Sequence, residues 1–310
     1  MQTFIDIVLS AGGSAVQVAL YTLLPIMVVM MITMRFLESW GVIDKLVAWL
    51  EPVTRPFGLT GLGVLAVIQL TFVSFVAPLP TLALMEDRGA SDRHLAAALA
   101  AVLAMAPANS TFPLTAMGLQ AGFVLMGSCV GGLVAAASTY WLFGRRRSTA
   151  IHARTRVEQA VAHDASALKI INVSGGEAIR IVMNIIPMLL LSLVVVMGLQ
   201  QMGAIAFATR MLGPVLSAVG IDTAYILPTL TKYLAGTTAL VGVVADLQKH
   251  GHFDALQLNH SAGFLLHPLD LPGVAILVSA GPRVAKALAP ALAGASAGIA
   301  VRAAAGLVFI

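Results

Sequence analysis

One uncharged apolar run constrains the fold of this chain more than any other feature. The stretch IIPMLLLSLVVVMGL at 185–199 contains no charged residue. A transmembrane helix needs about 20 apolar residues to cross roughly 30 Å of hydrocarbon, and this run meets that need together with its flanks. A transmembrane barrel would instead show segments of about ten residues with alternating polarity. The run therefore predicts a membrane-spanning helix.

The composition extends this prediction to the whole chain. Of its 310 residues, 59% are hydrophobic and only 10% are charged. About a quarter of the residues in a soluble domain are charged, so this chain cannot cover a water-facing surface. We predict an all-α, polytopic membrane protein of about eight to ten helices in the bacterial inner membrane. The net charge of +4 does not indicate nucleic-acid binding, because many basic residues lie in one interhelical segment.

The chain contains one structural unit twice. Pro25 and Pro187 lie 162 positions apart, and the same offset relates 24–59 to 186–221. Prolines and glycines coincide along this alignment, which matters because they dictate backbone geometry. With a short deletion, the alignment continues from Pro113 to Pro272. We predict a first gate-type repeat at 1–143, a linker at 144–177 and a second repeat at 178–310.

Both repeats predict the same order of elements. In order, these are a span (15–37 and 178–202), an amphipathic helix (42–56 and 204–218), a broken segment (60–85 and 222–246) and a helix pair (94–143 and 254–310). The linker is rich in arginine, and the positive-inside rule places it in the cytoplasm. An odd number of crossings in each repeat makes the repeats inverted and an even number makes them parallel; we favour inverted repeats.

Four interruptions fall inside apolar sequence. They are VAPLP at 76–80, MAPANSTFPL at 105–114, LAGTT at 234–238 and LLHPLDLPG at 265–273. Unpaired backbone groups cost several kcal/mol in hydrocarbon, so a break at membrane depth needs protein or water around it. We expect the breaks to border a shared water-filled cavity, although simple packed kinks remain an alternative. Paired broken helices are typical of binding sites in secondary transporters.

The polar residues near these breaks are the candidate substrate-binding residues. Lys232 stands out, because it lies in an otherwise uncharged segment, where a lysine costs about 3 kcal/mol unless it pairs or faces water. Asp270 is its natural partner, and the pair suits an acidic substrate or proton coupling, with a structural ion pair or a snorkelling lysine as alternatives. The full candidate set is Gln69, Ser74, Asn109, Ser110, Thr111, Lys232, Thr237, Thr238, His267 and Asp270.

Other sequence features point away from catalysis and metal chemistry. The chain has a single cysteine, Cys129, and no cysteine pair, phosphate loop or zinc motif. We therefore expect no enzyme activity, no cofactor and no metal site. His267 beside Asp270 suits proton handling. The acidic and basic residues at 86–88, with Asp92 and Arg93, are typical of a solvated loop.

The first repeat resembles a known family. WGVIDKLVAWLEPVTRPFGLTGLG at 40–63, a broken segment and then MAPANSTFP are similar to the nucleoside recognition, or gate, domain. That domain occurs in concentrative nucleoside transporters, ferrous iron permeases and spore-maturation-type membrane proteins. The second copy resembles it too, through GAIAFATRMLGPVLSAVGID, LTKYLAGTT and HPLDLPG. The resemblance implies a transport-type fold with pseudo-two-fold repeats.

These observations lead to one functional prediction and two alternatives. We predict a secondary transporter that binds a small polar solute near the bilayer midplane and is coupled to a proton or another cation. A non-transporting membrane scaffold of spore-maturation type and an ion channel are the alternatives. Glycines spaced four apart, as at Gly127 and Gly131 or Gly294 and Gly298, permit close helix contacts within or between protomers. We expect a homo-oligomer whose other partners are the solute and the lipid bilayer.

Overall fold

The regular secondary structure of this protein is helical wherever the structure describes it. The computed structural model describes residues 2–150, 167–203 and 222–309, together with Phe207, Arg210, Met211 and Pro214. All regular elements in these ranges are helices, which confirms the all-α prediction. The amphipathic helix expected at 204–218 lies almost wholly outside the described residues.

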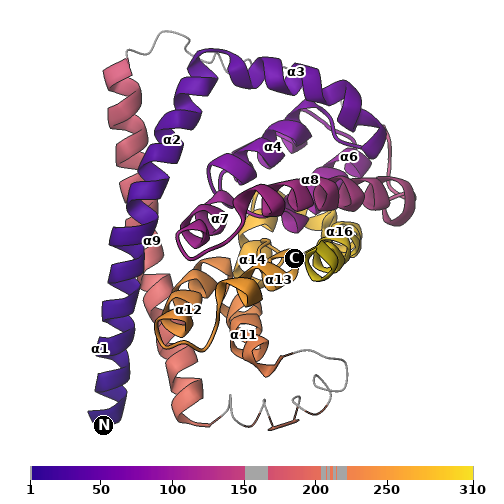
Figure 1. Cartoon of the computed structure of the whole chain (residues 1–310). Helices are drawn as coiled ribbons and strands as arrows, with labels where there is room; N and C mark the ends of the chain where they lie inside the picture. The colour runs from indigo at the N-terminus through magenta and orange to yellow at the C-terminus, as the bar shows by residue number, and fades with distance from the viewer. Residues whose placement is uncertain are drawn as a thin grey trace.

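Two long helices pack side by side and run antiparallel (Figure 1). The first consists of α1 (Gln2–Val16), a π-helical stretch η1 (Gln17–Leu23) and α2 (Leu24–Ser39), and the second is α9 (Ala167–Gln201). Both begin before the predicted spans at 15–37 and 178–202, so the last residues of the predicted linker are helical. The predicted spans were limited to the apolar residues, whereas the helical hydrogen bonds continue into the polar residues on either side. The π-helical stretch lies directly ahead of Pro25, whose ring cannot fit a regular helix interior.

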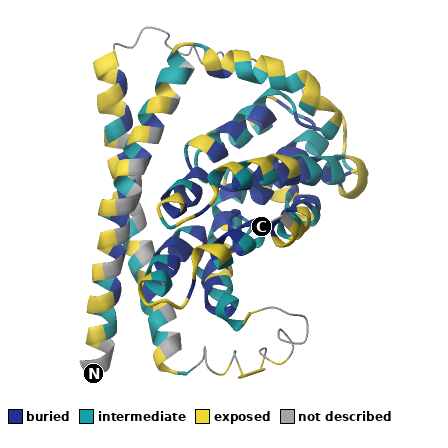
Figure 2. Ribbon diagram, viewed as in Figure 1, coloured by how far each residue is buried: buried dark blue, intermediate teal, exposed yellow. Residues whose placement is uncertain are grey.

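An amphipathic helix follows α2, as the sequence predicts. It comprises α3 (Val42–Thr54) and a 3₁₀ turn, η2 (Arg55–Phe57). Trp49 is 69% exposed and Ile43 is buried, so one face of α3 is outward and the other packs on the protein. Figure 2 shows the exposed residues running along α3. This distribution suits a helix that lies at the membrane interface.

The third segment of each repeat is a pair of short helices joined by a break. These are α4 (Gly61–Phe72) with α5 (Pro78–Asp87), and α11 (Ile226–Ala235) with α12 (Thr237–Lys249), the latter pair preceded by η4 (Thr223–Tyr225). At about 1.5 Å per residue, such helices reach roughly halfway across the hydrocarbon. Gly236 separates the second pair with φ +92°, a conformation that side chains disfavour. The predicted breaks are confirmed, although the first begins earlier, at 73–77, and its prolines start α5.

The last part of each repeat also contains a break. The first repeat has α6 (Asp92–Ala104), α7 (Ala108–Thr115), α8 (Ala121–Ser138) and the π-helical η3 (Thr139–Phe143); the second has α13 (Ala255–Leu265), α14 (Leu271–Val278), α15 (Pro282–Lys286) and α16 (Leu288–Phe309). The breaks occupy 105–107 and 266–270. The break in MAPANSTFPL therefore lies at its first residues, and Pro113 lies inside α7.

Three helices are long and apolar enough to cross a membrane within the described ranges. They are Asp92–Thr115, Ala121–Phe143 and Leu288–Val308, and a bent pair, Val42–Phe57 with Gly61–Phe72, adds a fourth candidate. This number refers to the described residues alone, and many of the other apolar helices in these ranges have only 8 to 13 residues. The molecule is thus a multi-pass membrane protein in which short helices pack among longer ones.

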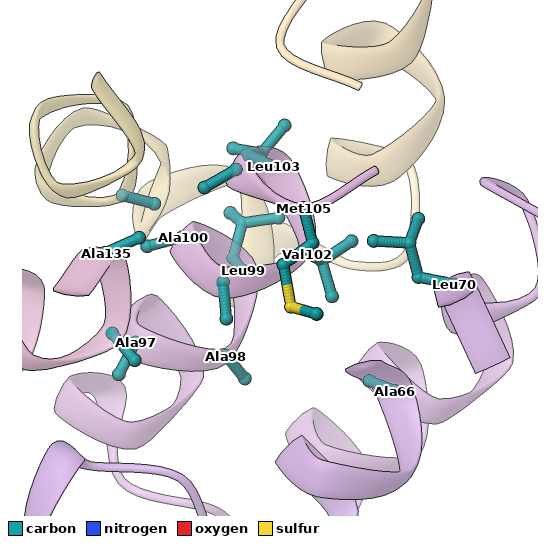
Figure 3. Close-up of a cluster of buried hydrophobic side chains, with 14 of the residues drawn as sticks. Ala66, Leu70, Ala97, Ala98, Leu99, Ala100, Val102, Leu103, Met105 and Ala135 are labelled. Carbon is teal, nitrogen blue, oxygen red and sulfur yellow. The ribbon is translucent and has the colours of Figure 1, made fainter. Parts of the chain in front are cut away.

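The α6 helix forms the centre of one hydrophobic core (Figure 3). Its run of alanines lets α4, α8 and α16 approach closely. Glycines do the same between α8 and α16, since a methyl group at Gly294 or Gly298 would collide with the α8–η3 backbone or side chains. Gly127, by contrast, faces open space. Gly131 on α8 also approaches Arg302 and Gly298 closely, so both predicted glycine pairs contribute to helix packing within this protomer.

Candidate functional site

A single side chain links three of the four breaks. Asn109, on the first turn of α7, accepts a hydrogen bond from the backbone N–H of Phe75 at 3.1 Å. Its amide nitrogen donates to the hydroxyl of Thr238, on the first turn of α12, at 3.3 Å. The second contact joins residues 129 positions apart and crosses from one repeat to the other. The breaks that the sequence predicts separately therefore meet at one place.

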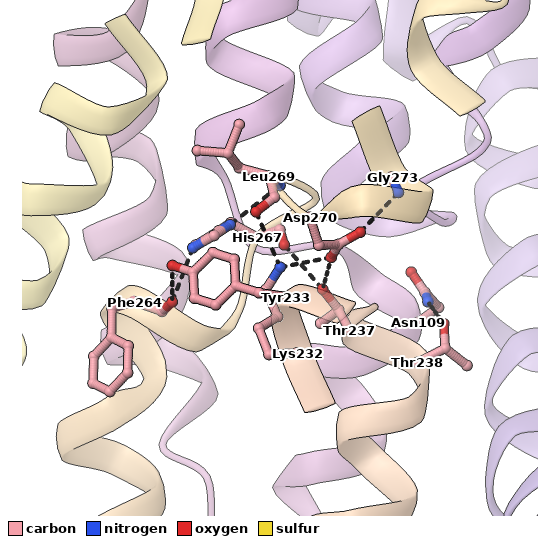
Figure 4. Close-up of polar contacts among 10 residues, drawn as sticks. All are labelled: Asn109, Lys232, Tyr233, Thr237, Thr238, Phe264, His267, Leu269, Asp270 and Gly273. Atoms are coloured by element: carbon pink, nitrogen blue, oxygen red, sulfur yellow. Dashed lines mark hydrogen bonds and ion pairs between the residues drawn. The ribbon is translucent and has the colours of Figure 1, made fainter. Parts of the chain in front are cut away.

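The fourth break contains Asp270, which forms the only buried ion pair among the described residues. Lys232 Nζ lies 2.6 Å from Asp270 Oδ2, and the two side chains are 0% and 3% exposed. Lys232 belongs to the last turn of α11, whereas Asp270 ends the break before α14 (Figure 4). The ammonium group also lies 3.4 Å from the carbonyl of Leu269. The predicted pairing of Lys232 with Asp270 is confirmed.

Asp270 organises the start of α14 as well as the ion pair. Its Oδ1 accepts the backbone N–H of Gly273 at 2.7 Å, a typical N-cap contact. Its Oδ2 accepts the Thr237 hydroxyl at 3.0 Å, and the same hydroxyl lies 2.9 Å from the His267 carbonyl. A methyl group on Gly273 would collide with the Pro268 carbonyl. The carboxylate therefore connects α11, α12 and α14.

His267 is held by backbone groups on both sides of its ring. Nε2 donates to the Phe264 carbonyl at 2.9 Å, and Nδ1 accepts the Leu269 N–H at 3.2 Å. These two partners assign the neutral tautomer with its proton on Nε2. His267 is fully buried. Its nitrogens brace the break at 266–270 and do not contact Asp270, in contrast to the expected proton-handling arrangement.

The remaining candidates of the first repeat mainly satisfy local backbone or side-chain partners. Ser110 and Thr111 both donate to the Pro107 carbonyl, at 3.2 and 2.9 Å, and are fully buried. Gln69 accepts the Thr81 hydroxyl at 2.7 Å and so ties α4 to α5. Ser74 is buried inside the break at 73–77.

The polar side chains at the breaks are paired with protein groups in this structure. Asn109, Lys232, Thr237 and Asp270 bond to one another or to neighbouring backbone, and each is at most 7% exposed. The expected water-filled cavity therefore does not surround these four groups. Mutual pairing removes the cost of burying each group alone, which explains how a closed arrangement is stable.

Two further residues bond to backbone groups at the break at 105–107, and the sequence did not identify them. The Arg302 guanidinium donates to the Ala104 carbonyl, the last carbonyl of α6. The Ser128 hydroxyl accepts the Ala106 N–H at 3.0 Å. Arg302 is only 3% exposed, and Gly131 and Gly263 leave room for it. A lone arginine in the apolar stretch GIAVRAAAGL is the signal that could have identified it.

A charged cluster joins the repeats at one rim of the core. Arg283 donates to Asp92 Oδ1 through Nε at 3.0 Å and Nη2 at 2.6 Å, and to the Ala90 carbonyl at 2.6 Å. The Glu86 carboxylate accepts the N–H groups of Arg283 and Val284 at 2.9 and 3.1 Å. We call these residues the ionic clasp. The expectation of a solvated loop at 86–88, with Asp92 and Arg93, holds for the exposed Asp87 and Arg88 but is wrong for Glu86 and Asp92, which bind the start of α15.

A neutral counterpart lies in the other repeat. Gln248 donates to the Met117 carbonyl at 3.0 Å. Asn259 accepts the Gln120 N–H at 2.7 Å and donates to the Gly118 carbonyl at 2.9 Å. We call Gln248 and Asn259, with the turn at 117–120, the amide clasp. Gln248 and Glu86 lie 162 positions apart, the offset of the predicted repeats, so these two positions match under that alignment.

The described residues hold no group of three or more histidine, cysteine, aspartate or glutamate side chains that could bind a metal ion.

A family model described as "Gate: Nucleoside recognition" matches residues 20–136. Over this segment the chain is similar to a nucleoside-recognition gate domain. It covers most of the predicted first repeat, from the second half of the first long helix to the end of α8. The resemblance predicted from the sequence is confirmed for this part of the chain.

The whole chain has the fold of a concentrative nucleoside transporter, CNTnw. A variant of CNTnw in an outward-facing state gives a TM-score of 0.67 at 14% identity, with 99% of this chain and 84% of that chain covered. A second variant, in an "intermediate 1" state, gives 0.61 at 14% identity over 99% and 85% of the two chains. At this identity the likeness establishes the fold alone. No curated protein sequence matches the chain.

Proposed function

We propose that this gate-domain protein is a secondary transporter that moves a small polar solute across the bacterial inner membrane. The main support is the meeting of four broken segments around a buried ion pair, Lys232 with Asp270. A buried charge pair is costly and is often less stable than an apolar replacement. Its presence inside an apolar helical core favours a functional role over a purely structural one.

The ion pair supports a proton-coupled cycle for an acidic solute. A carboxylate or phosphate of the solute replaces Asp270 as the partner of Lys232, and Asp270 takes up a proton from water. The buried charge is then the same before and after binding, because the added anion and the added proton cancel. Thr237 and Asn109 lie next to the pair through hydrogen bonds and supply neutral contacts to the solute.

Inverted repeats would allow the site to open first to one membrane face and then to the other. The first long helix and α9 are equivalent elements of the two repeats, and they run antiparallel in Figure 1. Equivalent elements of opposite direction are the mark of inverted repeats, in which the two halves exchange conformations. The paired, buried groups at the breaks fit a closed state between the two open ones.

The test is uptake into proteoliposomes under an imposed proton gradient. Thermal-shift screening against organic acids, nucleosides and amino acids first selects the solute, because a ligand of the native state raises the melting temperature. We expect Lys232→Met and Asp270→Asn to abolish gradient-driven uptake. Lys249→Met, which removes an exposed cation from the end of α12, is the control. Unchanged uptake in both site variants would exclude the proposed role of the pair.

A second candidate function is a membrane scaffold. The observation that favours it is the closed centre, in which Ser110, Thr111 and His267 are fully buried and bonded to their own backbone. A scaffold needs no access to that centre. Cysteine-accessibility labelling at position 109 distinguishes the two, because a transporter exposes this position to aqueous reagent during its cycle and a scaffold does not.

A further inference from the structure

Six cationic side chains gather where η2, α6, η3 and α15 meet. They are Arg55, Arg93, Arg145, Arg146, Arg147 and Lys286, and we call them the basic cluster. The segments are fixed to each other by direct contacts. Trp141 Nε1 donates to the Pro56 carbonyl at 2.8 Å, and Arg147 donates to the Lys286 carbonyl at 2.9 Å. The chain leaves the core here and enters the arginine-rich linker.

Arg93 is the best-held member of the cluster. Its guanidinium carbon lies 5.2 Å from the centre of the Tyr140 ring, and Nη2 donates to the Arg145 carbonyl. Its Nε is buried and has no hydrogen-bond partner in the described part of the chain. The cation is thus positioned by a ring and a carbonyl, both of which leave its charge uncompensated.

Carboxylates do not neutralise this cluster. None of its six cations forms an ion pair with an acidic side chain of the described residues. The acidic groups closest in sequence to Arg93 already have partners, since Asp92 binds Arg283 and Glu86 binds the start of α15. The local excess of positive charge therefore has no counterpart in these ranges and favours an external anion.

Exposed apolar side chains stand directly beside the cations. Trp141 is 62% exposed, Leu142 59% and Phe143 43%, and all three belong to η3 at the end of α8. Tryptophan is enriched at the headgroup level of membranes, and clustered arginines at a cytoplasmic membrane surface bind anionic headgroups. A soluble phosphate would use only the cations, whereas a lipid uses both features.

We propose that the basic cluster binds the headgroup of an anionic phospholipid, with its acyl chains against Trp141, Leu142 and Phe143. The phosphate lies among Arg93, Arg145 and Arg146, and the lipid fixes the end of α8 against η2. This site lies apart from the Lys232–Asp270 centre and does not depend on transport.

Native mass spectrometry of protein released from phosphatidylglycerol or phosphatidylcholine nanodiscs tests the proposal. We expect bound phosphatidylglycerol to be retained, and Arg145→Gln and Arg146→Gln to reduce its retention about fivefold each. Lys249→Gln removes one exposed cation elsewhere and should leave retention unchanged. Equal retention of the two lipids, or an equal loss in Lys249→Gln, would overturn the proposal. Displacement of the lipid by millimolar inorganic phosphate would overturn it in favour of a soluble anion site.

Tryptophan quenching gives a second measurement that does not depend on lipid surviving in the gas phase. The chain has three tryptophans, so replacing Trp40 and Trp49 with phenylalanine leaves Trp141 as the reporter. Dibrominated phosphatidylglycerol should quench Trp141 more strongly than dibrominated phosphatidylcholine at equal mole fraction. That preference should disappear in the Arg145→Gln, Arg146→Gln double variant, provided its melting temperature matches the parent. Equal quenching by the two lipids in the parent would contradict the site.

Discussion

The two predicted repeats satisfy their broken helices with different uses of charge. At the centre, the breaks of the first are bonded by neutral Asn109 and Ser128 and by a single buried cation, Arg302, whereas the second has the Lys232–Asp270 ion pair. At the rim the pattern reverses. The Glu86 carboxylate forms part of an ionic clasp, and the equivalent position, Gln248, forms a neutral one.

This difference teaches which charges are needed for the fold. The first predicted repeat shows that a broken helix pair can be satisfied without an ion pair, because Asn109, Ser128 and Arg302 bond backbone groups there. The neutral clasp shows the same for the rim. The central ion pair is buried and costly, so it suggests function, while the ion pair at the rim is partly exposed and inexpensive, so it suggests stability.

The largest expected effect comes from breaking the central pair on one side. Asp270→Asn leaves Lys232 buried without its carboxylate and should destabilise the protein by about 3 to 5 kcal/mol. A double variant, Lys232→Met with Asp270→Asn, removes both charges and should recover much of that loss. Denaturation in detergent, monitored by tryptophan fluorescence, measures the free energy of unfolding of each variant.

Uptake separates the two explanations for the pair. If the double variant is stable but inactive, the charges serve transport. If the double variant is stable and transports normally, the pair is structural and the comparison between centre and rim fails.

A smaller effect tests the glycine contacts that hold α16 in place. Gly298→Ala puts a methyl group against the Gly131 carbonyl and should cost about 1 to 3 kcal/mol. Gly127→Ala is the matched control, because nothing lies within 4 Å of the added methyl group. The melting temperature should fall only in Gly298→Ala; an equal fall in both would show that α8 and α16 do not pack through this face.

The two clasps should contribute similar free energies of unfolding, but only the contribution of the ionic clasp should depend on salt. Arg283→Gln and Gln248→Leu each remove inter-repeat hydrogen bonds, and each should cost about 1 to 2 kcal/mol. The Arg283 and Asp92 side chains are 22% and 32% exposed, so salt screens their attraction. Raising salt to about 1 M should therefore shrink the deficit of Arg283→Gln and leave that of Gln248→Leu unchanged. An identical salt response in both variants would remove the distinction between the clasps.

The smallest expected effect is at the contact between repeats. Thr238→Val removes the hydroxyl that accepts the Asn109 amide, in a bond that is long at 3.3 Å, and introduces no charge. The neutral bond is worth about 1 kcal/mol, so we expect a shift of a few degrees in melting temperature. Asn109→Ala loses the same bond together with the contact to Phe75, so adding Thr238→Val to it should cause no further loss. A fully additive loss would mean that the two residues act separately.

Much of the fold could be predicted from local sequence. Apolar runs indicated membrane helices, and the recurrence of Pro25 at Pro187 and Gly41 at Gly203 indicated the duplication. The breaks were found because proline and glycine limit backbone geometry within a few residues. The pairing of Lys232 with Asp270 was also predictable, since a charge at membrane depth needs a partner.

Other features could not be found in this way. Arg302 lies in a helix that looks like an ordinary span, and only the packed structure brings it to the end of α6. Glu86 and Asp92 look like loop residues, because their partner Arg283 is almost 200 positions away. Ser110 and Thr111 look available for a solute until the turn after Pro107 directs them to its carbonyl.

The sequence by itself determined the membrane environment, the helical class and the places where helices break, and it predicted the duplication. These features follow from apolarity and from backbone restrictions that act over short distances. Only the tertiary structure decided which side chain bonds the free backbone groups at each break. Hydrogen bonds such as that of Asn109 with Thr238 join parts of the chain 129 residues apart, and their geometry exists only after the two repeats have packed together.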